Sequence, residues 1–143
     1  MRTWNSAAGT MTVDSVEIVG NRASGAAPNQ GGGGIFNIGG DLTVVNTDIR
    51  GSIADGAAGS GGGILNRDGG TLNVSDSTLE GNRSMRAGGG VEDNASTTTL
   101  TDVQLLSNTT GTAPGNGGGL HATGAASVTV VSGVVMSNTA AAE

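Results

Sequence analysis

The sequence predicts an all-β fold: a single-stranded parallel β-helix (β-solenoid), right-handed, with about five coils of roughly 26 to 31 residues. A glycine triplet followed by a branched aliphatic residue recurs four times, beginning at Gly32, Gly61, Gly88 and Gly117. After each triplet, apolar residues alternate with polar residues over short segments, which is the period of a strand. No segment of about ten residues carries the 3.6-residue apolar period of an amphipathic helix. Short strands in repeats of about 30 residues are typical of this solenoid.

The 143 residues are expected to form one domain, 1–143, built from five repeats. The first repeat lacks the triplet but aligns with the second, because Thr3-Trp4-Asn5 matches Ile35-Phe36-Asn37. The repeats are approximately 1–31, 32–60, 61–87, 88–116 and 117–143.

Three strands are expected in each repeat. The first holds Ile35 and its equivalents, the second holds Leu72 and Val74, and the third holds Leu79. Like residues of successive coils then stack about 4.8 Å apart and form a thin continuous core, which needs almost no aromatic residues. The apolar columns are Met11, Leu42, Leu72, Thr98 and Val128; Val13, Val44, Val74, Leu100 and Val130; and Ile18, Ile49, Leu79, Leu105 and Val135.

Two polar columns indicate the corners between strands. One consists of Asn21, Asn82, Asn108 and Asn138, with Ser52 standing in once, and stacked asparagines can form side-chain ladders. The other consists of Ser15, Asn46, Asp76, Asp102 and Ser132. The variable segments 22–31, 53–60, 83–87 and 109–116 are then loops on one side of the solenoid, where repeat proteins usually bind their ligands.

Composition excludes several classes of function. The net charge is −6, with six arginines and no lysine, so no basic patch exists for nucleic acid or an anionic membrane surface. The absence of cysteine excludes disulfides, thiolate metal sites and a cysteine nucleophile. Without a run of about 18 apolar residues, no membrane insertion is expected. No signal peptide is recognised after Met1.

Gly-Gly-Gly-Ile-Phe-Asn at 32–37, followed by Leu42-Thr43-Val44, resembles the repeats of right-handed parallel β-helix proteins of bacterial surfaces. The most similar repeats are those of polymorphic outer-membrane-protein-like proteins, and pectate-lyase-like enzymes share the architecture. The resemblance covers essentially the whole chain. It implies a parent protein that is extracellular or displayed on the cell surface, with a role in adhesion or carbohydrate contact. The calcium-binding aspartate clusters and the catalytic arginine or lysine of the polysaccharide-cleaving enzymes are not recognisable.

The chain starts inside a coil and stops where the next triplet would begin. Both end coils are therefore expected to expose strand edges, which invite pairing. This predicts a homo-oligomer or a part of a longer chain.

The residue after each post-triplet aliphatic points outward by strand alternation. Trp4, Phe36 and Leu65 are expected to form an exposed apolar stripe there, with Arg67 on the same face. Such a stripe could stack on sugars or dock a protein, so these four residues are the candidate binding site. The alternative is that loops or a second subunit cover the stripe.

Glu92 and His121 continue the same column on adjacent coils and are expected to touch. A carboxylate beside an imidazole can carry out general acid–base catalysis near neutral pH. Thr123 or Asp93 would be the nearby nucleophile or second acid, so these four residues are the candidate catalytic group. The alternative is an ordinary surface pair worth under about 1 kcal/mol.

Asp76 and Asp102 align on successive coils, and two carboxylates about 5 Å apart could share a calcium ion. A ladder of turn residues is the alternative, because Ser15, Asn46 and Ser132 occupy the same column. Otherwise no metal or cofactor is expected.

Three classes of function follow from these observations. The leading one is a structural or adhesive module that binds glycan or protein through its outer face and loops. A carbohydrate-active or ester hydrolase or lyase, with a site around His121 and Glu92, is the second. A self-assembling solenoid segment is the third. The lack of recognisable metal and acid–base clusters favours the first.

Overall fold

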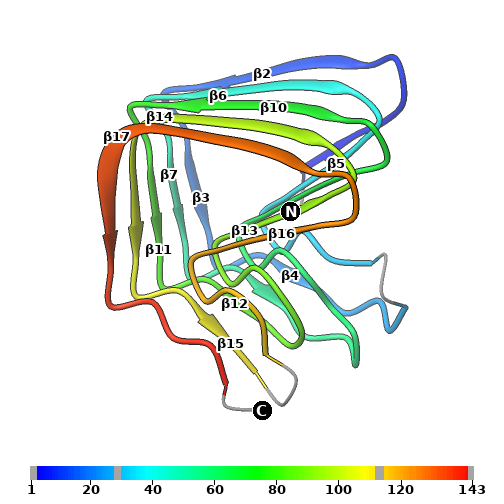
Figure 1. Ribbon diagram of the computed structural model, residues 1–143, viewed down its shortest axis with the longest axis vertical. Coiled ribbons are helices and arrows are strands. Elements are labelled where there is room, and N and C mark those ends of the chain that lie inside the picture. The colour runs from blue at the N-terminus through cyan, green and yellow to red at the C-terminus, as the bar shows by residue number, and fades with distance from the viewer. Residues whose placement is uncertain (1–2, 28–29, 112–114, 142–143) are drawn as a thin grey trace.

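The computed structural model describes residues 3–27, 30–111 and 115–141 as a parallel β-solenoid of about four turns (Figure 1). Within these residues every strand pair is parallel and no helix occurs, which confirms the all-β parallel β-helix. The sequence predicts five coils, and the difference lies in the last repeat. There the final strand is reduced to a single bridge between Thr109 and Thr139.

Three sheets form the sides of the solenoid. Sheet A, the first strand of each repeat, contains β1 (Thr3–Asn5), β5 (Ile35–Ile38), β9 (Ile64–Arg67), β13 (Val91–Asn94) and β16 (Leu120–Thr123). Sheet B contains β2 (Thr10–Asp14), β3 (Glu17–Val19), β6 (Asp41–Val45), β7 (Asp48–Arg50), β10 (Thr71–Ser75), β11 (Thr78–Glu80), β14 (Thr97–Leu106) and β17 (Ser127–Met136). In Figure 1 these strands stack from blue β2 to orange and red β17.

A third sheet arises where the sequence predicts only loops. Sheet C contains β4 (Arg22–Ala23), β8 (Ile53–Ala54), β12 (Arg83–Ser84) and β15 (Thr109–Thr110). These two-residue strands open the variable segments and pair in register from coil to coil. They leave no periodic signal in the sequence because two residues are too short to show alternation.

The predicted apolar columns are confirmed by the pairing register. Leu72 pairs with Leu42 on one side and with Thr98 on the other. Leu79 is likewise placed between Ile49 and Leu105. Together with Ile35, Ile64 and Val91 of sheet A, the aliphatic residues that these columns have in the first four coils form one continuous cluster. The core of these coils is therefore aliphatic.

The corner inside sheet B is also confirmed. All five residues of its column adopt a left-handed backbone conformation, with φ of 56° at Ser15, 48° at Asn46, 49° at Asp76, 53° at Asp102 and 62° at Ser132. Asparagine and aspartate tolerate this conformation better than other side chains do, because they can bond to their own backbone. Asp76 and Asp102 thus have a turn role at exposed positions.

Asparagines form the predicted ladder at the corner between sheets B and C. The Asn82 amide donates to Oδ1 of Asn108 at 3.0 Å, and the Asn108 amide donates to Oδ1 of Asn138 at 3.0 Å. The Asn82 amide also donates to the backbone carbonyl of Ile49, and the Asn108 amide donates to that of Leu79. The structural role of these asparagines is therefore confirmed.

The last rung is the most exposed part of sheet B. Val130 and Val135 of β17, which belong to the apolar columns, are exposed, whereas Val13 and Ile18 in the first rung are buried. On its outward side β17 carries Val131 and Val134, which are exposed as well. Self-association through the coil ends stays a prediction. In the described ranges, no helix is long and apolar enough to cross a membrane.

Candidate functional site

The predicted outward column of sheet A exists, but most of it is covered. Trp4, Phe36, Leu65, Glu92 and His121 are paired in register on successive strands. Phe36, Leu65 and Glu92 are nevertheless buried, so the expectation of an exposed apolar stripe is wrong for Phe36 and Leu65. The cause is that residues of the variable segments return over this face, with Gln30 opposite Phe36 and Arg86 against Glu92.

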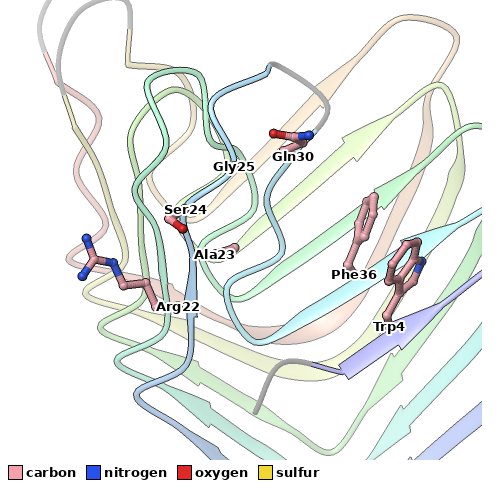
Figure 2. Close-up of a pocket in the computed structure, with 7 residues that line it drawn as sticks. All are labelled: Trp4, Arg22, Ala23, Ser24, Gly25, Gln30 and Phe36. Carbon is pink, nitrogen blue, oxygen red and sulfur yellow. The ribbon is translucent and has the colours of Figure 1, made fainter.

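The uncovered end of the column opens into a pocket of about 480 Å³, here called the aromatic pocket. Its walls are the two rings and the segment after β3: Trp4, Arg22, Ala23, Ser24, Gly25, Gln30 and Phe36. Trp4 is 62% exposed. Its ring centroid lies 5.8 Å from that of Phe36, with 36° between the ring planes. Figure 2 shows the two rings side by side, facing the chain that carries Ser24 and Gly25.

The charge beside the aromatic pocket is already neutralised. Arg22 forms an ion pair with Asp55 of the next coil, and its guanidinium points away from the two rings (Figure 2). The hydrogen bond to Asp55 raises the pKa of Arg22, and the same bond lowers the pKa of Asp55. The polar groups beside the rings are therefore those of Ser24 and Gln30. The arginine that lines the pocket, Arg22, is already paired with a carboxylate.

Leu65 and Arg67 lie outside the aromatic pocket. Leu65 is buried in β9, one coil further along. Arg67 ends the same strand and forms an ion pair with Asp68 at 2.7 Å. Of the four predicted binding residues, the structure therefore brings only Trp4 and Phe36 together at a cavity.

A second group of polar side chains surrounds Glu92. Its Oε2 lies 2.7 Å from Nδ1 of His121, and its Oε1 lies 3.4 Å from the Arg86 guanidinium. Nε of Arg86 also donates to the Ser60 hydroxyl at 3.1 Å. The predicted Glu92–His121 contact is present. The reading as an ordinary surface pair is wrong, because Glu92 is fully buried.

Burial sets the electrostatics of this group. It raises the pKa of Glu92, although the neighbouring His121 and Arg86 favour the ionised form and oppose the shift. The His121 side chain is 23% exposed, so its ring reaches the surface while its Nδ1 is held by the carboxylate. When Nδ1 donates to Glu92, the other ring nitrogen is the proton acceptor. Sequence reasoning missed Arg86 and Ser60 because they come from variable segments.

Asp93 does not belong to this group. Strand alternation turns it to the opposite side of β13, where it is fully buried next to Asn66 and Thr98. The expectation that it serves His121 as a second acid is therefore wrong. Thr123 lies two residues beyond His121 on β16, half-buried and paired in register with Asn94.

Asp93 instead continues a second ladder of asparagines, which sequence reasoning also missed. Asn5 donates to Asn37 Oδ1 at 2.9 Å, and Asn37 donates to Asn66 Oδ1 at 2.8 Å. The signal was available, because these residues occupy the same position of successive repeats. In the described part of the chain, no three acidic or histidine side chains gather in a way that could hold a metal ion.

No protein-family model, curated protein or solved structure matches the chain. The aromatic pocket and the group around Glu92 are the features that bear on its function.

Proposed function

We propose that the chain is a binding module of a secreted or surface-displayed bacterial β-helix protein, and that it binds a glycan in the aromatic pocket. The supporting observation is a largely exposed tryptophan beside a second ring at the mouth of a polar-walled cavity. Sugar rings have apolar C–H faces and polar rims. They match a site in which flat aromatic rings lie next to hydrogen-bonding groups.

The charge distribution favours a neutral saccharide. Arg22 is already paired with Asp55, so the pocket offers no free cation to a carboxylate or sulfate group. The net charge of −6 further disfavours an anionic polymer. The extracellular location and the adhesive role rest on the resemblance to bacterial surface repeats and are part of the proposal.

Trp4→Ala is expected to weaken retention by a neutral polysaccharide at least about tenfold, because one stacking face is lost. The measurement is electrophoresis of the wild type and the variant through gels that contain single neutral or anionic polysaccharides. Val19→Ala is the matched control, since Val19 is an exposed apolar residue in the same coil but on sheet B. A wild type that no neutral polysaccharide retards would refute the proposal. Equal retention of Trp4→Ala would refute the site.

A second candidate is an enzymatic activity at His121: hydrolysis of a glycan or an ester, or eliminative cleavage of a glycan by a lyase. The 2.7 Å contact between His121 Nδ1 and Glu92 Oε2 favours it, because a buried carboxylate fixes the ring and its tautomer. His121 would then act as general base toward water or toward Thr123.

The same polysaccharides, together with chromogenic glycosides and esters, test this candidate by turnover. If the candidate is right, His121→Ala lowers the rate by about 10²–10⁴-fold, as expected for the loss of a general base. Thr123→Val separates the two routes, because it abolishes turnover only if Thr123 is the nucleophile. Turnover that survives in His121→Ala, or no turnover by the wild type, removes the candidate.

A further inference from the structure

The ladder on the inner side of sheet A follows one rule in its first three coils. The side-chain amide of each asparagine donates to a side-chain oxygen of the next coil, which is an asparagine Oδ1 or the Thr98 hydroxyl, and to two backbone carbonyls. Asn5 donates to the carbonyls of Gly9 and Asp41, Asn37 to those of Gly40 and Thr71, and Asn66 to those of Gly70 and Thr97. Amide N–H groups therefore fill the space between the ladder and these carbonyls.

Asp93 breaks this rule in the fourth coil. It pairs in register with Asn66, so it occupies the ladder position, but an ionised carboxylate has no hydrogen to donate. Its side chain is fully buried, and neither carboxyl oxygen has a hydrogen-bond partner of good geometry. A buried charge without partners costs several kcal/mol more than a paired one.

The register also shows what a donor at this position would meet. Thr71 pairs with Thr97, and Thr97 pairs with Ser127. The carbonyls that correspond to those of Gly70 and Thr97 in the next coil are therefore those of Ser96 and Ser127. A carboxylate oxygen in place of the amide nitrogen would face carbonyl oxygens, which repel it.

We propose that Asp93 is a buried proton-binding site: it is a neutral carboxylic acid at neutral pH, and its O–H takes the place of the asparagine amide by donating to the carbonyl of Ser96 or Ser127. One proton is then bound when the fourth and fifth coils assemble. Ionisation of Asp93 would separate β13 and β14 from β16 and β17 at this corner.

The surrounding groups agree with this assignment. Burial raises the pKa of Asp93 and outweighs the Thr98 hydroxyl, the Ser96 N–H and the Asn66 amide, which favour the ionised form. The charged side chains on adjoining strands are Glu92 on β13, His121 on β16, Arg67 on β9 and Asp102 on β14, of which Asp102 is exposed. Glu92 and His121 face each other, and Arg67 is paired with Asp68. None of these supplies Asp93 with a partner in the described structure.

The direction of the pH effect follows from the raised pKa. The protonated form is favoured in the folded state, so the stability from Asp93 is complete below the ordinary carboxyl pKa. It is lost as the pH rises toward the folded pKa. In that window the folding equilibrium constant falls about tenfold for each pH unit, which is the signature of one proton.

The test compares Asp93→Asn with the wild type in urea unfolding from about pH 4 to about pH 9. The variant restores the amide, so it should fold at least about tenfold more favourably at pH 7 and lack the one-proton slope. Asp102→Asn is the matched control, because Asp102 is exposed in a turn, and it should leave the slope unchanged. Infrared spectra of the wild type at pH 7 should contain a carboxylic-acid carbonyl band that Asp93→Asn lacks.

Two results would overturn the proposal. The first is a wild type without the acid band at pH 7, whatever the stability of the Asp93→Asn variant. The second is stabilisation of the wild type, but not of Asp93→Asn, by added calcium or sodium, since a cation would then replace the proton. The infrared measurement uses the wild type alone, so it decides the question even if the variant folds poorly.

Discussion

Gly89→Ala is expected to destabilise the chain by at least about 4 kcal/mol, a large part of the 5–15 kcal/mol that a typical domain has. A Cβ on Gly89 would lie 2.5 Å from the carbonyl oxygen and 2.6 Å from the nitrogen of Thr109, and closer still to the carbonyl oxygen of Gly118. All three are backbone atoms held in sheet C and in the next coil, so no side-chain rotation relieves the overlap. Gly89 would have to move away from Thr109 in its own coil and from Gly118 in the fifth coil.

Gly81→Ser is the matched control for this variant. Gly81 has a φ of 61°, but a Cβ there would meet no atom within 4 Å. The equivalent position in later coils already holds Ser107 and Ser137, with φ of 52° and 58°. The expected cost is about 1 kcal/mol, that of a left-handed non-glycine residue. The measurement is urea unfolding followed by far-ultraviolet circular dichroism, and equal midpoints for Gly89→Ala and Gly81→Ser would contradict the close-approach argument.

The glycine triplet illustrates what the sequence predicts well. Its recurrence identifies the repeat, and each glycine has its own physical reason. Gly88 has a φ of 60°, Gly89 passes against sheet C, and a Cβ on Gly90 would lie 3.2 Å from the Asn108 amide. Repeats are predictable because the same physical constraint acts in every coil, so the residue type that satisfies it recurs at a regular spacing in the sequence.

The covering of sheet A illustrates what the sequence does not predict. Alternation assigns Phe36 and Glu92 to the outward side of their strands, and the structure keeps them there. Strand alternation does not reveal that the variable segments return over that side, because the packing of these segments has no sequence period. The aromatic pocket and the contact of Arg86 with Glu92 both depend on those segments.

Asp93 shows a third situation, in which the sequence holds the signal but its meaning needs the structure. Asn5, Asn37, Asn66 and Asp93 form a visible column. Only the hydrogen bonds of the first three show that the position requires a donor. A departure from a repeat that costs stability is typical of a functional residue, and Asp93 is such a departure.

Asn108→Ala is the second change with a large expected effect, about 3–5 kcal/mol of destabilisation. Oδ1 of Asn108 accepts from both the backbone nitrogen and the amide of Asn82, each at 3.0 Å. Its own amide donates to the carbonyl of Leu79 at 2.8 Å. Alanine removes all of these bonds and leaves the partners buried, and each unsatisfied buried group costs about 1–3 kcal/mol.

Asn73→Ala separates this effect from the general loss of an asparagine. Asn73 lies on β10 with its side chain exposed, so its replacement should change the free energy of unfolding by no more than about 0.5 kcal/mol. Both variants are compared with the wild type by urea unfolding. If Asn108→Ala unfolds within about 1 kcal/mol of Asn73→Ala, water fills the vacated ladder position and the ladder adds little. If the predicted gap is found, the corner between sheets B and C is held by side-chain amides as much as by the aliphatic columns, which explains how a chain with one phenylalanine and one tryptophan folds.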